Sequence, residues 1–236
     1  MKNNVYKIYR YEKKYLLGKV LANDIQEEIK HLMNQDENGT TGGQYLVRSL
    51  YFDSIYNKDY YDKMDGVENR KKIRIRIYSI KDIFGKLESK IKCGDLQTKK
   101  SIIISRYEIE ELIKGNYEVL LDDASEERLH FYITLKNELY KPVTMVEYDR
   151  TAFFSSQYNT RVTFDRNVRF SETNYNLFSN NVAVKEAFIG KTILEVKYNE
   201  KLLPYISKQL SNYNLTQMAI SKYCTCRPVM TGMILD

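Results

Sequence analysis

In Arg70-Lys71-Lys72-Ile73-Arg74-Ile75-Arg76-Ile77-Tyr78, charged and branched apolar residues alternate. An alternation of period two is typical of a β-strand and cannot form one face of a helix. Three cations (Lys72, Arg74 and Arg76) therefore point to one side of the strand, and the isoleucines point to the other. Because a row of three exposed isoleucines is unfavourable, we expect the isoleucines to face a core and the cations to face water or anions.

The same pattern recurs in four further segments of the chain. Residues 9–15, 87–92, 161–165 and 194–198 each place charged residues of mixed sign on one side of an extended segment. A sixth segment, 145–150, is less regular, because Glu147 and Arg150 fall on opposite sides unless a bulge intervenes. One such strand is an ordinary solvated surface. Several together favour a rolled sheet whose charged faces converge on an interior that holds water, ion pairs, or a charged anion with a metal.

Composition limits the classes of protein that this chain can belong to. A length of 236 residues fits one substantial domain, and 37 Lys and Arg against 31 Asp and Glu give a formal charge of +6. This modest excess suggests anionic partners without selecting nucleic acid over phosphates. The three cysteines are odd in number and lack zinc-site spacing, so we expect reduced, structural residues. Because no signal-like or membrane-spanning apolar run is visible, we expect a cytoplasmic chain without a transmembrane segment of its own.

Periodicity and turn residues predict a single α+β domain covering residues 1–236. Strands are expected at 6–15, 44–53, 70–78, 86–92, 99–104, 142–154, 158–170 and 192–198. Helices are expected at 16–34, 54–64, 106–114, 124–137 and 201–223, with irregular segments at 34–43 and 174–181.

Common catalytic motifs are absent from this sequence. Gly190-Lys191-Thr192 ends like a phosphate-binding loop, but Lys185 stands where the first glycine belongs. Neither His31 nor His130 has a serine or cysteine partner motif. Aromatic and basic residues interleave at 9–15, but carboxylates on the same faces would repel a nucleic-acid backbone, so we expect no nucleic-acid partner.

Basic faces with a few acids suit phosphate chemistry. Arginine and lysine neutralise phosphate oxygens, and carboxylates hold a divalent metal that bridges those oxygens. Phosphoryl transfer needs little else, because positioning and charge stabilisation supply most of the catalysis.

Eight short motifs, in order along the chain, then carry a family resemblance. They are RYEKKY at 10–15, SLYFD at 49–53, KIRIR at 72–76, ESK at 88–90, EYDR at 147–150, RVTFD at 161–165, EVK at 195–197 and SKY at 221–223. Together they resemble the VTC domain, the polyphosphate polymerase module of the triphosphate tunnel metalloenzyme superfamily. The resemblance implies an antiparallel eight-stranded β tunnel, or barrel, with helices packed outside. It also implies transfer of the terminal phosphate of ATP to a polyphosphate chain, with Mn²⁺ or Mg²⁺ as cofactor.

The resemblance also implies roles for individual residues. The catalytic phosphate-binding residues would be Arg74, Arg76, Lys90, Arg161 and Lys222. Further phosphate contacts would come from Arg10, Lys14, Arg48, Lys72, Arg150, Arg169 and Lys197. Metal ligands would be Glu195, Glu12 and Glu147.

One departure bears on the choice of reaction. The first strand carries a single acid, Glu12, where CYTH-type triphosphatases of the same superfamily show a paired ExExK motif. This favours a polymerase over a two-metal hydrolase. A triphosphate or polyphosphate hydrolase and a non-catalytic polyphosphate-binding module remain as alternatives. The implied partners are ATP and inorganic polyphosphate, and any membrane association would need a separate partner.

Overall fold

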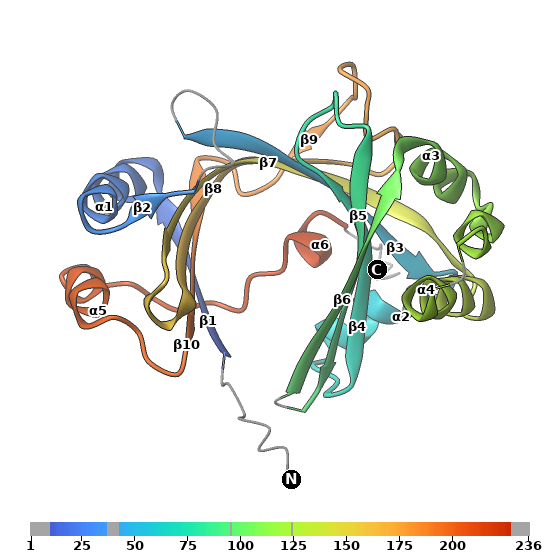
Figure 1. Cartoon of the computed structure of the whole chain (residues 1–236). Coiled ribbons are helices and arrows are strands. Elements are labelled where there is room, and N and C mark those ends of the chain that lie inside the picture. Colours follow the sequence, from blue (N-terminus) through green and yellow to red (C-terminus); the bar gives the residue numbers. More distant parts are fainter. Residues whose placement is uncertain (1–9, 37–42, 95, 124, 228–236) are drawn as a thin grey trace, which may run out of the picture. The chain divides into compact units, whose positions relative to one another are not determined.

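A computed structural model describes residues 10–36, 43–94, 96–123 and 125–227 (Figure 1). Within these residues, eight strands are joined in the order β1-β10-β8-β7-β3-β4-β5-β6, with β2 beside β7 and β9 beside β8. The strands are β1 (Arg10–Gly18), β2 (Asn34–Gln35), β3 (Gln44–Ser54), β4 (Arg70–Ile77), β5 (Phe84–Cys93), β6 (Leu96–Ser105), β7 (Tyr140–Ser155), β8 (Thr160–Ser171), β9 (Lys185–Glu186) and β10 (Lys191–Asn199). The helices are α1 (Lys19–Leu32), α2 (Lys58–Met64), α3 (Arg106–Lys114), α4 (Glu126–Asn137), α5 (Pro204–Ser211) and α6 (Lys222–Thr225), with 3₁₀ turns η1 (Tyr117–Leu121) and η2 (Gln157–Asn159). The predicted α+β fold class, an antiparallel sheet of eight strands with helices, is confirmed.

The chain divides into two compact units. Among the described residues, the first contains 10–36, 43–45, 148–168 and 188–220, and the second contains 46–94, 96–123, 125–147, 169–187 and 221–227. Strands β7 and β8 contribute residues to both units.

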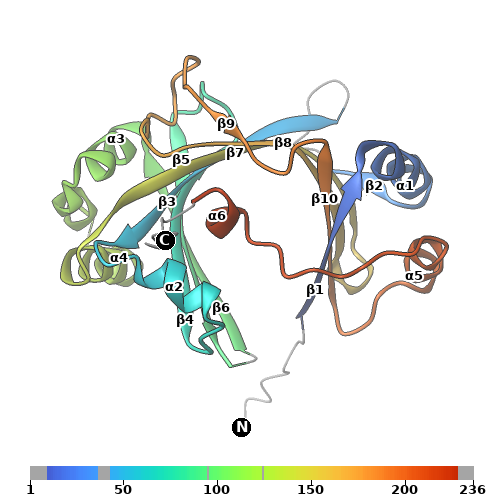
Figure 2. The same cartoon turned by 180° about the vertical axis from the view of Figure 1, so that it is seen from behind.

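The first unit packs α1 and α5 against the apolar side of β1, β10 and β8. Alternate strand residues such as Val162 and Leu194 are fully buried in one cluster with Ile25 and Ile29 of α1 and Ile206 of α5. The two helices lie side by side in both views (Figures 1 and 2). Apolar residues at every second position of the strands therefore pack in one core with apolar residues that are four positions apart on α1.

The second unit contains residues 70–78, in which charged residues alternate with isoleucines. Ile73, Ile75 and Ile77 of β4 are at most 1% exposed and pack in one cluster with Ile109 of α3 and Phe131 of α4. The prediction that the isoleucines face a core is confirmed. Figures 1 and 2 show α3 and α4 on one face of β4–β6 and α6 on the other face. The cationic side of β4 therefore faces α6.

The predicted helix at 201–223 is wrong over most of its length. Helix α5 begins at Pro204 and ends at Ser211, and the next helical turn is α6. Between them, the backbone pairs with β1: Met218 N donates to Lys14 O at 2.9 Å, and Gln217 bridges to Tyr15. Asparagines at 212 and 214 favour leaving a helix, because their side chains compete for backbone hydrogen bonds.

Two shorter differences concern the first part of the chain. Strand β1 continues to Gly18, three residues further than predicted, because Leu16 and Leu17 stay in register with β10. A short strand, β2, forms in the predicted loop at 34–43. The predicted strand residues 6–9 and loop residues 37–42 lie outside the described residues.

None of the helices in the described part of the chain combines the length and the apolarity that crossing a membrane requires.

Candidate functional site

The polar face of β4 and β5, in the second unit, is rich in cations. The register places Lys72 opposite Lys90, Arg74 opposite Glu88 and Arg76 opposite Lys86. Five cations on two adjacent strands thus share this face with one carboxylate. Directly opposite residues have Cβ atoms about 4.5–5.5 Å apart. Their combined positive potential favours an anionic ligand.

Glu88 is the carboxylate that holds the two arginines of this face. Arg74 donates to Glu88 Oε2 through Nε and Nη2, each at 2.8 Å, and Arg76 Nη1 lies 4.0 Å from the same oxygen. Burial raises the pKa of Glu88, but Arg74, Arg76 and Lys99 together outweigh burial and lower this pKa to about 2. Glu88 therefore stays ionised and orients the guanidinium groups.

Tyr51 of β3 reports on the same positive potential. Its phenol is buried, and Arg74 Nη1 donates to its oxygen at 3.3 Å. Burial alone raises the pKa of a phenol, yet the charges of Arg74, Arg76 and Lys72 lower the pKa of Tyr51 below its ordinary value. The cations thus outweigh burial at this position.

The segment at α6 lies against this face and carries the predicted residue Lys222. Lys72 Nζ donates to Ser221 Oγ at 2.8 Å and lies 5.4 Å from the centre of the Tyr223 ring. Tyr223 also stacks on Tyr51, with ring centroids 5.1 Å apart. Lys222 is therefore held on a segment that contacts the predicted phosphate-binding residue Lys72.

A buried carboxylate, Asp53, holds this segment in place. It accepts hydrogen bonds from the Tyr223 hydroxyl, from Arg227 Nη1 at 3.0 Å, and from the backbone N–H groups of Asp59 and Tyr60 at the start of α2. Asp53 lies within a motif of the family resemblance, but nothing in the sequence gave it a role. Asp53 and Tyr223 are 170 residues apart in the sequence, so local sequence patterns could not predict their contact.

Three more predicted residues form a second cluster in this unit. Glu147 lies between two arginines, with Arg48 Nη2 at 2.6 Å and Arg169 Nε at 3.0 Å. Arg48 also donates to the carbonyl oxygens of Leu177 and Ser179, at 2.9 and 2.7 Å. Arg48 is 5% exposed, so its donors stabilise the segment after β8. The roles assigned to these three residues from the family resemblance stay predictions.

In the first unit, the polar face of β1 and β10 carries charges of alternating sign. The register places Glu12 opposite Lys197 and Lys14 opposite Glu195. Lys14 Nζ lies 2.6 Å from Glu12 and 3.6 Å from Glu195, and it donates to Ile220 O at 3.2 Å. Lys197 pairs with Glu195 and lies 4.0 Å from Glu12. The pairing of β1 with β10 therefore brings Glu12 and Glu195, the two predicted metal ligands of this unit, close together.

The arginines of β7 and β8 in the first unit are paired with acids. Arg150 donates to both oxygens of the fully buried Asp165, at 2.6 and 2.8 Å. Arg161 pairs with Asp36 and donates to the Tyr45 hydroxyl at 3.1 Å. These contacts fix the side chains of Arg150, on β7, and Arg161, on β8.

The two remaining predicted residues lie on exposed parts of strands. Arg10 lies at the start of β1, opposite Asn199, and Lys90 lies on β5 between Lys72 and Lys99. Both side chains are exposed. Strand register therefore puts Lys90, but not Arg10, beside other predicted phosphate-binding residues of its unit.

Glu12 and Glu195 fit a divalent cation. Both carboxylates lie within 4 Å of one ammonium group, Lys14 Nζ, so they are close enough to share one cation. Carboxylate oxygens are the ligands that Mg²⁺ and Mn²⁺ prefer. Over residues 10–36, 43–94, 96–123 and 125–227, no three His, Cys, Asp or Glu side chains form a metal-binding group. A site here would therefore need further oxygen ligands.

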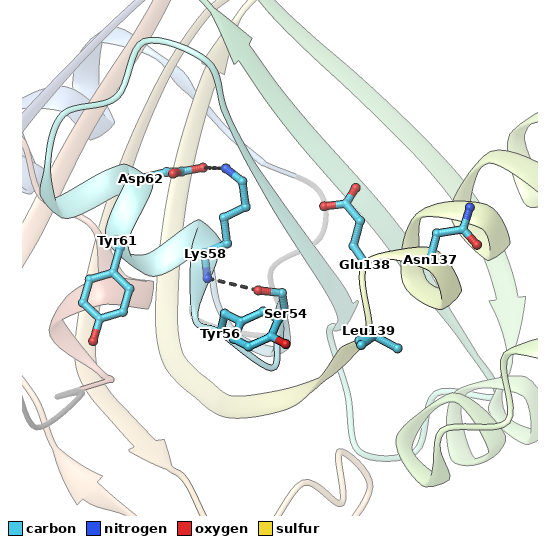
Figure 3. Close-up of a pocket in the computed structure, with 8 residues that line it drawn as sticks. All are labelled: Ser54, Tyr56, Lys58, Tyr61, Asp62, Asn137, Glu138 and Leu139. Carbon is cyan, nitrogen blue, oxygen red and sulfur yellow. Dashed lines mark hydrogen bonds and ion pairs between the residues drawn. The ribbon is translucent and has the colours of Figure 1, made fainter.

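A shallow pocket in the second unit is separate from the cationic face (Figure 3). It is lined by Ser54, Tyr56, Lys58, Tyr61, Asp62, Asn137, Glu138 and Leu139. Lys58 pairs with Asp62 across its opening, and the Lys58 N–H bonds Ser54 Oγ at 3.1 Å. Its one lysine is neutralised, so this pocket has none of the positive potential found on β4 and β5.

The fold and the two charged strand faces define an α+β protein built on an antiparallel sheet. Comparison with family models makes this more specific: the chain belongs to the VTC domain family, whose model matches residues 9–231. The family resemblance stated from the sequence is therefore confirmed. Among curated proteins, no significant match to this sequence is found.

One solved structure supports the fold assignment. A Bacillus halodurans protein provisionally assigned as an adenylate cyclase is similar at a TM-score of 0.53 and 12% identity, over 90% of this chain and 95% of that chain. A Pyrococcus horikoshii protein has a TM-score of 0.46 and 11% identity, over 92% and 97% of the two chains. A Pyrococcus furiosus protein has a TM-score of 0.41 and 10% identity, over 86% of each chain. The first of these similarities shows a shared fold.

Proposed function

We propose that this protein is a metal-dependent polyphosphate polymerase that transfers the γ-phosphate of ATP to a polyphosphate chain. The observation that carries the proposal is the polar face of β4 and β5, which five cations share with one carboxylate. Membership of the VTC domain family supports the same choice of substrate. Anions with closely spaced charges, such as a triphosphate, match such a row of cations.

In the second unit, we assign phosphate binding to Arg74, Arg76, Lys72, Lys90 and Lys222. Glu88 would orient the guanidinium groups of Arg74 and Arg76, whose fork geometry suits phosphate oxygens. Lys72 and Lys222 would be aligned by the segment that Asp53 anchors. These cations would neutralise charge that develops on phosphate oxygens during transfer.

In the first unit, we assign metal binding to Glu12 and Glu195 and phosphate binding to Lys14, Lys197, Arg161 and Arg150. The assignment of Glu147 as a metal ligand, and of Arg10, Arg48 and Arg169 as phosphate contacts, rests on the family resemblance alone. A divalent ion bound by Glu12 and Glu195 would neutralise phosphate oxygens and polarise the phosphorus centre. The residues themselves bind and orient the substrate.

Incubation of the purified protein with ATP and Mn²⁺ tests this proposal. We expect polyphosphate, resolved by gel electrophoresis and ³¹P NMR, together with ADP. Arg74→Ala and Arg76→Ala should each lower the rate by about 10²-fold or more, as loss of a charge-stabilising donor does. Lys114→Ala on α3, where Lys114 is exposed and pairs with Glu111, removes the same charge and should leave the rate unchanged.

Other outcomes would select the alternatives. Release of inorganic phosphate without polymer would indicate a triphosphate hydrolase on the same fold. Tight binding of polyphosphate without turnover in Mn²⁺ or Mg²⁺ would indicate a non-catalytic binding module. Either result contradicts the polymerase assignment.

A further inference from the structure

Two threonine hydroxyls of the first unit are buried without a hydrogen-bond partner among the described residues. They are Thr163 Oγ1 on β8 and Thr192 Oγ1 on β10. Thr163 is 4% exposed and Thr192 is fully buried. A buried hydroxyl without a partner destabilises a folded protein, so each such group needs an explanation.

The two hydroxyls lie on opposite sides of the sheet. Thr163 alternates with Val162 and Phe164, which are fully buried in the apolar core, so Thr163 shares the polar side with Arg161 and Asp165. Thr192 instead shares the side of Leu194 and Val196, which belong to the same core. Thr163 therefore points toward the charged residues, and Thr192 points toward the core.

Thr163 lies directly opposite Glu195 in the β8–β10 register. At this position, Cβ atoms are about 4.5–5.5 Å apart, and a direct hydrogen bond between hydroxyl and carboxylate is within reach. The Thr163 hydroxyl makes no such bond. The Glu195 carboxylate instead contacts the ammonium groups of Lys197 and Lys14. The hydroxyl and the carboxylate are thus two oxygen groups on adjacent strands that a third group could bridge.

We propose that Thr163 Oγ1 is a ligand of a divalent cation, together with the carboxylates of Glu195 and Glu12. This inference rests on the metal dependence of the proposed function and adds a ligand to it. Mg²⁺ and Mn²⁺ accept neutral hydroxyl oxygens beside carboxylates, as the serine or threonine of phosphate-binding loops shows. Because Thr163 lies directly opposite Glu195, a cation bound by the hydroxyl could also contact a carboxylate oxygen.

Binding of Mn²⁺ alone, measured by electron paramagnetic resonance of the free ion, tests this inference without any activity assay. Thr163→Val keeps the shape of the side chain and removes the oxygen, and it should weaken Mn²⁺ binding by about tenfold or more. Thr163→Ser retains the oxygen and should bind Mn²⁺ within about threefold of the wild type. Thr192→Val is the matched control, because it removes an equally buried hydroxyl from the core side and should not change Mn²⁺ binding.

Thermal denaturation separates ligand loss from misfolding. Both valine variants should melt at or above the wild-type temperature, because each removes a buried hydroxyl without a partner. The inference is overturned if Thr163→Val binds Mn²⁺ as the wild type does, if Thr192→Val weakens binding equally, or if the wild type binds no Mn²⁺. A wild type that makes no polyphosphate, but whose Mn²⁺ binding depends on Thr163, would overturn the proposed function and retain this inference.

Discussion

At the scale of single residues, Glu88 couples the stability of the second unit to pH. Burial raises its pKa, but Arg74, Arg76 and Lys99 together lower it to about 2, against an ordinary value of 4.5. A carboxylate whose pKa is lower in the folded state stabilises the fold above pH 4.5, and this stabilisation is lost as the pH falls toward 2. Glu88→Gln should therefore cost about 1–3 kcal/mol in the free energy of unfolding at pH 7 and almost nothing near pH 2.

Urea denaturation of both proteins between pH 2 and pH 7 measures this difference. A matched control is Glu118→Gln, because Glu118 pairs with Lys136 at 2.6 Å on exposed helix surfaces. Such an exposed pair contributes little to stability, because water and salt screen it. An equal effect of both variants at pH 7 would contradict the role of Glu88.

At the scale of elements, the two sides of β4 have different roles. The isoleucine side stabilises the fold, and we propose that the cationic side binds phosphate. Ile75 is fully buried in the core cluster, so Ile75→Ala should cost about 2–5 kcal/mol in the free energy of unfolding. Arg76 lies on the other side and donates to Ser49 Oγ at 3.2 Å, so Arg76→Ala should cost less than about 1.5 kcal/mol. Chemical denaturation checks both values, and a larger loss in Arg76→Ala would mean that the arginine is mainly structural.

The anchor of α6 is a second element-scale feature. Asp53 accepts from Tyr223, from Arg227 and from the start of α2, so Asp53→Ala leaves a buried arginine without its carboxylate. Loss of one partner of a buried pair costs about 3–5 kcal/mol. Asp62→Ala, on the same helix, breaks only the pair with Lys58 and should cost less than about 1 kcal/mol.

Hydrogen exchange at α6 locates this effect. Protection of the Thr225 and Cys226 amides, which bond Ser221 O and Lys222 O, should fall in Asp53→Ala and stay unchanged in Asp62→Ala. Unchanged protection in Asp53→Ala would show that α6 is held by other contacts.

Local patterns predicted the elements better than they predicted the contacts between them. Alternation located β4, β5, β8 and β10, because one buried face imposes a period of two. The helical spacing of apolar residues misled at 201–223. There the backbone of Gln217 and Met218 pairs with β1 and does not form a helix. Asp53, Tyr51 and Thr163 were visible in motifs, but their roles depend on partners that lie far away in sequence.

At the scale of the whole molecule, two separate cores support two charged faces. The apolar clusters of the first and second units contain no residue in common. On the β4–β5 face, cations outnumber the one carboxylate, whereas on β1 and β10 acids and lysines alternate. This difference is the basis for proposing that the first of these faces binds phosphates alone and that the second binds a metal ion beside phosphates. The tunnel predicted from the sequence stays a prediction.

Calorimetric titration with tripolyphosphate tests the central claim, that the β4–β5 face binds phosphates. The double variant Arg74→Ala/Arg76→Ala is compared with Lys114→Ala/Lys136→Ala, which removes the same charge from exposed pairs on α3 and α4. We predict that the first variant binds at least about 10²-fold more weakly than the wild type and that the second binds within about threefold of it. Equal weakening in the two variants, or wild-type affinity in the first, would contradict the claim.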